Sequence, residues 1–478
     1  MLPLMRTALD PKVRELRWGG RHPDGSVRLD ALGPDAPEKA AHEEPAWVQL
    51  DATRPLLVGV LPHSQCNPKV EGCGFCTFPH DPYNKGLLSL TSEEVIDQIY
   101  HFFDAHPELT KRRVEGVYFG GATANLTPAK KLSRTFDALA QHLDLRAAEV
   151  TLEGVPRLFR SLFRGPFDAL LDMNARHRRI SMGVQTFDDA MLARMGRQHF
   201  GGSEEVKRVV DKAHRHGLTA SGDFLINLPS QPRQRMIEDV REAAAIGLDQ
   251  ICVYHLVLSP NHGTPWGQDP SVIAELPSLE QASSNWLAVR EELLKLGYVQ
   301  STLTNFERAD VHATDRRFVY ETASFTPEQY DALGFGPLSI STFTDLPRRR
   351  AVKFARGKSL RSPVWGQDDL YFAYEEEDVR LFFLTRTLCR LGVSLATYRE
   401  LFGAALTDHF GEAVDAIVEA GLATLGSSLR LTPRGMFYAD SAAGLFAWSR
   451  AESLREKGAG RSTREMLQGA IRFNDFMG

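Results

Sequence analysis

Three cysteines in one short segment carry the strongest chemical signal of the chain. Cys66, Cys73 and Cys76 are three of only 5 cysteines in 478 residues. Thiolates bind zinc and iron-sulfur clusters, and the Cys-x2-Cys spacing of the last two lets one turn aim two sulfurs at one site. Three ligands rather than four leave one position open, which a purely structural site normally closes with protein. The segment therefore predicts a metal or iron-sulfur centre that does chemistry.

Two alternatives stay open at this point. A structural zinc ion would take His63 or His80, which flank the cysteines, as its fourth ligand. A disulfide is less favoured, because an odd cysteine count without a secretory signal indicates a reducing compartment. Cys252 and Cys389 lie in apolar sequence, and we expect them to be ordinary buried thiols.

The composition is that of a soluble enzyme. The chain has 56 basic and 61 acidic residues, a net charge of −5, without a long block of one sign. This argues against nucleic-acid and membrane-surface binding. The N-terminus carries charges too early for an export signal, and no run of about 18 apolar residues occurs. We therefore expect a cytoplasmic protein.

Six short apolar runs, each followed by a stretch of helical period, must position the chemical groups. Alternating units of this kind form a parallel sheet or barrel. Thr91 or Ser92 is expected to cap the first helix. The six runs are residues 56–61, 116–119, 149–153, 179–185, 220–228 and 250–256.

Unusual residues recur where these strands end. The carboxyl ends of parallel strands meet at one edge, where the working residues of such folds lie. The cysteine segment follows the first run. The later runs carry, in chain order, Gly120-Gly121, Glu153, Gln185, Asp223 and Tyr254-His255. The periodic placement predicts one shared site.

Several segments in the same order resemble motifs of the radical S-adenosylmethionine (SAM) enzymes. The branch is that of oxygen-independent coproporphyrinogen III oxidase (HemN/HemW-like). The resemblance covers roughly residues 55 to 345, and the rest more loosely. The matching segments are Val117-Tyr-Phe-Gly-Gly-Ala-Thr123, Thr151-Leu-Glu-Gly-Val-Pro156, Ser181-Met-Gly-Val-Gln-Thr-Phe-Asp-Asp189, Met195-Gly-Arg-Gln-His199, Gly222–Gln231 and Tyr330–Ser341.

This resemblance implies an α/β fold: a partial (β/α)6 radical SAM barrel with a C-terminal helical, winged-helix-like domain. It implies that Cys66, Cys73 and Cys76 hold a [4Fe-4S] cluster whose fourth iron binds SAM. A low-potential donor such as flavodoxin or ferredoxin would supply the electron that cleaves SAM to a 5′-deoxyadenosyl radical. One or two SAM molecules are expected.

Carried over by position, the resemblance assigns SAM contacts to residues from each strand end. Phe75 would pack on the adenine, and Arg197 would grip the carboxylate. The backbone of Gly120 and Gly121 would meet the methionyl amine. Glu153 would accept from the amine or ribose, with Gln185 and Asp223 completing the ribose and carboxylate contacts. His255 is assigned a catalytic role near the substrate or a second SAM.

The chain also departs from the pattern of this branch. Six residues separate Cys66 from Cys73, where three are usual, and Ala122 replaces the third glycine. The heme-trafficking relatives carry a His-Asn-x-x-Tyr-Trp element, and the corresponding stretch from His312 lacks the Trp. We interpret His312 as a surface histidine. The lengthened cysteine loop favours a tailoring reaction on a small organic molecule, methyl transfer above all, over heme synthesis.

Coproporphyrinogen-type decarboxylation and heme trafficking stay open as alternatives. The expected domains are a lead-in over 1–50, the barrel with its extension over 51–345, a basic connector over 346–370 and the helical domain over 371–478. The connector is interpreted as solvated, with polyanion or porphyrin-carboxylate binding as the alternative. We expect the helical domain to act as a lid, without nucleic acid.

Overall fold

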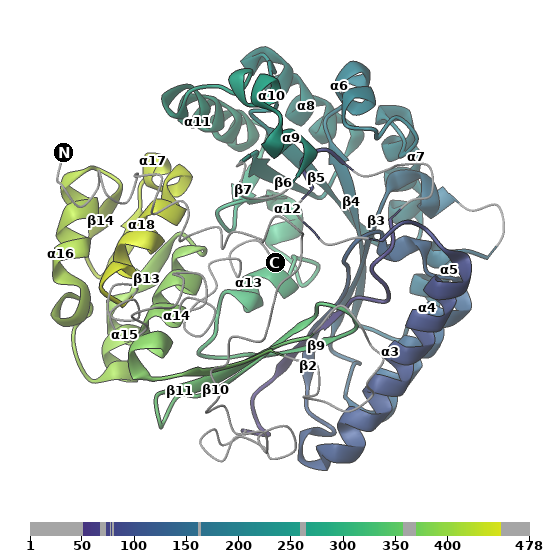
Figure 1. Cartoon of the computed structure of the whole chain (residues 1–478), viewed down its shortest axis with the longest axis horizontal. Coiled ribbons are helices and arrows are strands. Elements are labelled where there is room, and N and C mark those ends of the chain that lie inside the picture. The colour runs from purple at the N-terminus through teal and green to yellow at the C-terminus, as the bar shows by residue number, and fades with distance from the viewer. Residues whose placement is uncertain are drawn as a thin grey trace.

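The computed structural model describes residues 51–66, 73–76, 78, 81–160, 164–258, 264–356 and 370–450. Its centre is a 12-stranded sheet with the order β12-β11-β10-β9-β1-β2-β3-β4-β5-β6-β8-β7 (Figure 1). The six strands from β1 to β6 are parallel and sequential, and each matches a predicted apolar run. They are β1 Leu56–Val60, β2 Val114–Phe119, β3 Glu149–Gly154, β4 His177–Gln185, β5 Thr219–Ile226 and β6 Gln250–His255. The expected partial barrel is confirmed.

Helices cover the outer face of this sheet, as Figure 1 shows. They are α3 Lys85–Ala105, α4 Ala129–His142, α5 Pro166–Asp172, α6 Asp189–Arg194, α7 Ser203–Arg215, α8 Arg233–Ile246, α9 Pro265–Gln268, α10 Pro270–Ala274 and α11 Leu279–Lys295, with 3-10 turns at Pro107–Leu109, Ala124–Leu126 and Pro156–Arg160. Helix α3 begins earlier than predicted. Asn84, not Thr91 or Ser92, caps it by accepting from the Leu87 N–H at 3.0 Å.

Strands beyond the six units widen the sheet on both sides. Parallel to β1 lies β9 (Asp331–Phe335), followed by the antiparallel strands β10 (Ile340–Asp345), β11 (Arg350–Ala355) and β12 (Leu370–Tyr374). On the other side β8 (Asn305–Arg308) and β7 (Tyr298–Gln300) are antiparallel. The short helices α12 (Ala309–His312) and α13 (Tyr320–Ser324) precede β9.

The expected connector over 346–370 is partly wrong. Its residues Arg350–Ala355 form β11, paired along their whole length with β10, and Lys353 is only 1% exposed. Pairing with β10 and the burial of Ala351 and Val352 make this segment a strand despite its basic charge. Residues 357–369 lie outside the described part of the chain.

The C-terminal region builds its own core around Phe383, Tyr398 and Phe402. Its elements are α14 Glu376–Leu388, β13 Gly392–Ser394, α15 Leu395–Phe402, α16 Leu406–Glu419, β14 Ala423–Leu425, β15 Ser428–Leu431, α17 Pro433–Phe437 and α18 Ala439–Phe446. Helices around a three-stranded sheet confirm the expected helical, winged-helix-like class. None of the helices among the described residues has the length and apolar character that crossing a bilayer requires.

Candidate functional site

Period-two alternation gives the parallel strands one apolar and one polar face. Val150 and Leu152 of β3 belong to the hydrophobic core beneath the helices. Glu149, Thr151 and Glu153 alternate with them and face inward. Sheet register then aligns the predicted residues: Glu153 pairs with Ser181, and Gly183 pairs with Asp223. The strand ends thus form a polar interior.

The cysteine segment is anchored to the beginning of α3. Asp81 accepts from the Ser64 hydroxyl at 2.6 Å, and its carbonyl accepts from the Cys66 N–H at 3.4 Å. The Asn84 N–H donates to the side chain of Gln65 at 2.7 Å. At the other end of the segment, the Cys76 N–H donates to the Cys73 carbonyl at 3.1 Å. These bonds hold the cysteines beside the carboxyl end of β1.

The three thiols lie within electrostatic reach of one another. Burial raises the pKa of Cys66 to about 11; Thr123 donates to its sulfur and opposes this shift, whereas Cys76 and Cys73 add to it. Burial also raises the pKa of Cys73, against the nearby charge of Arg197. Thiols in this setting need the positive charge of bound iron to ionise.

Arg197, a predicted SAM contact, lies directly against Cys73, a predicted cluster ligand. Its Nη1 donates to the Cys73 sulfur at 3.2 Å and its Nη2 to the Gly183 carbonyl at 2.6 Å. The guanidinium carbon lies 4.2 Å from the centre of the Phe200 ring. The Nε atom is buried without a hydrogen-bond partner. An unpaired buried donor of this kind suits a carboxylate ligand.

Glu153 lies against the glycine pair. The Gly121 N–H and the Tyr118 hydroxyl donate to its carboxylate. Burial, followed by the nearby Asp223, raises the pKa of Glu153 to about 8. A Cβ on Gly120 would stand 2.7 Å from the Tyr118 Cε1 and 2.8 Å from the Glu153 Oε2, so these side chains would have to shift to admit a larger residue. Gly121 has a φ of +112°, which favours glycine.

Asp223 completes the acidic pair at the strand ends. Burial raises its pKa, while hydrogen bonds from Cys252 and Ser181 and the charges of Arg179 and Arg197 oppose the shift. Gln185 ends β4 with a φ of +73°, a strained backbone for a non-glycine residue that turns the strand end. Two carboxyl groups and a guanidinium therefore converge where the sequence predicted.

Phe75 belongs to a small apolar cluster at the same edge, together with Tyr254 and Trp266. The ring centroids of Phe75 and Trp266 are 5.9 Å apart, and the backbone N–H of Trp266 donates to the Gly74 carbonyl at 2.9 Å. The indole packs so closely on Gly74 that a Cβ there would overlap it. Sequence reasoning missed Trp266, because no motif marks it.

His255 lies at the seam between the sheet and the C-terminal region. Its Nδ1 is 3.0 Å from the Nδ2 of Asn227, and its ring centroid is 4.9 Å from that of Phe437. Asn227, with a φ of +61°, also accepts from Asn285 at 2.8 Å. The structure thus places His255 beside α17 as well as at the end of β6.

A buried cation below the predicted site was also missed. Arg179 is 2% exposed, and its guanidinium carbon lies 3.6 Å from the centre of the Phe318 ring; its Nη2 donates to Gln250. Its charge acts on Glu149 and Glu321, whose pKa values burial raises to about 7. The sequence signal that could have revealed Arg179 was the placement of charged residues at alternate positions of the strands.

The surroundings of His63 do not favour its role as a zinc ligand. Burial lowers its pKa to about 4, and its Nδ1 accepts from the Gln65 N–H at 3.1 Å. His80 lies outside the described residues. In the described part of the chain, which includes Cys66, Cys73 and Cys76, no group of three His, Cys, Asp or Glu side chains is arranged to hold a single metal ion, so the three thiols would have to move closer together to bind any metal centre. His312 contacts Glu307 at 2.8 Å and is 37% exposed, as a surface histidine would be.

Comparison with known proteins identifies the class. Residues 61–243 match the Radical SAM superfamily, and residues 375–438 match the HemN C-terminal domain. The heme chaperone HemW of Escherichia coli is 29% identical over 218 residues, or 43% of this chain and 52% of HemW. A mitochondrial radical S-adenosyl methionine domain-containing protein 1 of Mus musculus is 25% identical, over 84% of this chain and 81% of the mouse protein.

A solved structure shows the same fold. Coproporphyrinogen III oxidase (HemN) of Escherichia coli has a TM-score of 0.67 at 18% identity, covering 84% of this chain and 92% of that one. The family match and the fold indicate a radical SAM protein. Through the matched HemN C-terminal domain and the HemW relatives, the chain is similar to the HemN/HemW-like branch of that superfamily. It spans about half the length of E. coli HemW.

Proposed function

We propose that this protein is a radical SAM enzyme that reductively cleaves SAM to modify a small organic substrate. The observation that carries the proposal is the contact of Arg197 with Cys73, beside Glu153 and Asp223 at the adjoining strand ends. One guanidinium, two carboxyls and three thiols match the donors that SAM and a cluster with an open iron require. The thiols of Cys66, Cys73 and Cys76 would hold the [4Fe-4S] cluster.

Each proposed SAM contact follows from side-chain chemistry. The free Nε of Arg197 would bind the SAM carboxylate, and Asp223 would accept from ribose hydroxyls. Glu153 would accept from the amine, near the backbone of Gly120 and Gly121. Phe75 would pack on the adenine from its apolar cluster, and Gln185 would bind the ribose. When bound, cluster and SAM together supply the one-electron chemistry that removes a hydrogen atom from a substrate.

We infer that the reaction is a tailoring reaction on the substrate, above all methyl transfer. The reason is that the extended interval from Cys66 to Cys73 departs from the spacing typical of the oxidase. His255 would act on the substrate or a second SAM. The C-terminal region would serve as a lid, since Phe437 packs on His255. The enzyme would work in the cytoplasm with a low-potential electron donor. Decarboxylation of the coproporphyrinogen type is the alternative within the same chemistry.

Heme binding is a second candidate function. The observation in its favour is that relatives such as E. coli HemW are named heme chaperones. Such a protein would use the barrel as a scaffold for heme, and substrate turnover would be absent.

An anaerobic assay separates these functions. The protein would be reconstituted with iron and sulfide, reduced with dithionite and mixed with SAM, and the products analysed by mass spectrometry. We expect 5′-deoxyadenosine, with S-adenosylhomocysteine alongside it if methyl transfer occurs. Stoichiometric heme uptake without either product, from protein with a full cluster, would favour the chaperone function.

A further inference from the structure

Helix α3 presents an exposed apolar surface next to the cysteine segment. Tyr83, Leu87 and Leu90 are 39%, 46% and 55% exposed. Leu87 and Leu90 are three positions apart and so share one side of the helix, whereas the neighbouring Leu88 is 2% exposed and packs inward. Large apolar side chains grouped in this way on a surface mark an interaction site. We call Tyr83, Leu87 and Leu90 the α3 patch.

Residues that flank the α3 patch are hydrogen-bonded to the segment around Cys66. Asn84, which caps α3 beside Tyr83, donates from its N–H to Gln65, the residue before Cys66. Asp81 binds both Ser64 and the Cys66 N–H. The patch therefore begins one or two residues from bonds that reach the first cysteine. A partner docked here would lie beside the metal site, on the outer side of the barrel.

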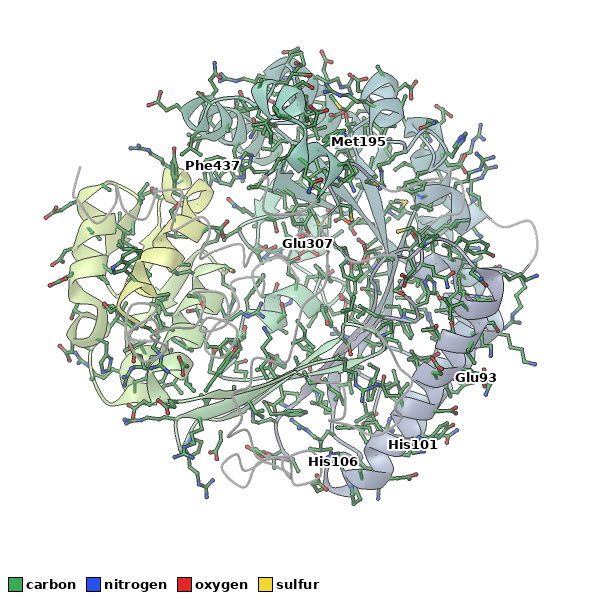
Figure 2. All side chains as sticks on the ribbon, viewed as in Figure 1. Glu93, His101, His106, Met195, Glu307 and Phe437 are labelled. Carbon is green, nitrogen blue, oxygen red and sulfur yellow. The ribbon has the colours of Figure 1, made fainter. Side chains whose placement is uncertain are left out.

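Basic residues lie on α3 and on the neighbouring α4. Residues 81–94 and 128–134, which include the first turns of both helices, carry four basic and three acidic side chains. Glu93, labelled on α3 in Figure 2, is paired with both Lys131 and Arg134 of α4. Lys85 and Lys130 are exposed. A small apolar centre with a positive rim suits a negatively charged partner.

We propose that the α3 patch is the docking surface for a small acidic electron-transfer protein that reduces the cluster. The inference rests on the proposed function, because that chemistry needs an external electron for every SAM cleaved. Electron transfer weakens steeply with distance, so the donor must dock close to the cysteines. Redox encounters also use small interfaces. A rim of charge would speed the encounter.

The test compares protein-driven with chemical reduction of the reconstituted full-length protein. Reduced flavodoxin, an acidic flavoprotein, would be mixed anaerobically with the cluster-loaded protein, and bleaching of the cluster followed by stopped flow. The variants are Leu87→Asp with Leu90→Asp, and Lys85→Glu with Lys130→Glu. Leu294→Asp with Lys295→Glu, a similarly exposed pair on α11, is the matched control.

We expect the flavodoxin-driven rate to fall about tenfold or more in both α3 variants at low ionic strength. Reduction by dithionite and the control variant should keep the wild-type rate. Unchanged flavodoxin rates in the α3 variants would overturn the proposal. An equal loss of the reduction rate with flavodoxin and with dithionite would overturn it too, because it would indicate damage to the metal site. The milder variant Lys85→Gln, which removes the charge without reversing it, distinguishes such damage from lost docking.

The proposed function is read out separately. Reduction of the cluster requires no SAM cleavage, so the docking result stands whether or not 5′-deoxyadenosine forms. Wild-type protein that is reduced by both agents yet never cleaves SAM contradicts the proposed function alone. Wild-type protein that cleaves SAM with dithionite but is not reduced by flavodoxin contradicts the docking proposal alone.

Discussion

The guanidinium of Arg197 donates to the Cys73 sulfur, 124 positions earlier in the chain, at 3.2 Å and to the Gly183 carbonyl, 14 positions earlier, at 2.6 Å. One side chain thereby fixes the distance between the cysteine segment and the end of β4. Because its Nε has no partner, the same side chain has a donor available for a ligand. The predictions below follow from this site and from the packing around it.

Replacing Arg197 tests the proposed carboxylate contact. We expect Arg197→Lys to keep the cluster and to weaken SAM binding by roughly ten- to a hundredfold, because an ammonium cannot reproduce paired guanidinium hydrogen bonds worth about 1.5–3 kcal/mol. Isothermal titration of SAM into reconstituted protein, with iron and sulfide analysis, measures both. SAM affinity equal to wild type would remove Arg197 from the SAM site.

Removing one cysteine tests the ligand assignment. Cys73→Ala should abolish cluster binding, and with it SAM cleavage, while the protein stays soluble. Cys389→Ala is the control, since that buried thiol lies in the C-terminal region and donates to the Thr385 carbonyl at 3.5 Å. Iron content and the visible absorption of the reconstituted proteins report the outcome. A full iron complement in Cys73→Ala contradicts the assignment.

The raised pKa of Glu153 predicts pH-dependent SAM binding. SAM is cationic at its amine and sulfonium, so it binds best when Glu153 is ionised. With a pKa of about 8, the free site must lose a proton on binding, and affinity should rise as the pH increases from 6 to about 8. Glu153→Gln should keep the cluster, bind SAM more weakly and lose most of this pH dependence.

The same group affects stability in the opposite direction. Its carboxyl ionises near 4.5 when unfolded but only at about 8 when folded. The stabilisation of the folded state is therefore present below pH 4.5 and is lost as the pH rises towards 8, by an amount on the order of a few kcal/mol. Denaturant titrations of the cluster-free protein at pH 5 and pH 8 should show a smaller loss in Glu153→Gln than in wild type. Equal losses would mean that other buried acids, such as Glu149 and Glu321, dominate.

A glycine in the C-terminal region offers a test of its packing. A Cβ on Gly435 would overlap the Leu422 carbonyl, whereas a Cβ on Gly426 meets no atom within 4 Å. We expect Gly435→Ala to cost about 2 kcal/mol or more of unfolding free energy, because backbone cannot yield as a side chain can. Gly426→Ala should be close to neutral. Thermal and denaturant unfolding of the two variants would compare them directly.

The elements and the edge at which the chemistry lies could be predicted from local sequence patterns. Apolar runs of strand length alternating with helical stretches are local signals, and parallel strands must present their carboxyl ends together. That reasoning placed Glu153, Gln185 and Asp223 at adjoining strand ends. It located the start of α3 less well, because Asn84 competes with Thr91 and Ser92 as a cap and only the fold decides among them.

Which of the predicted site residues contact one another depends on the packing of the folded chain. The contact of Arg197 with Cys73, the packing of Trp266 on Gly74 and the position of Arg179 under the acidic pair depend on crossings between distant strands and loops, which leave no periodic pattern. The basic residues around β11 likewise led to the prediction of a connector in place of a strand, because the pairing of β11 with β10 is a tertiary contact that the local sequence does not show. Local patterns therefore specify the elements and their polarity, whereas the buried charges and close packing of the site follow from where the folded elements meet.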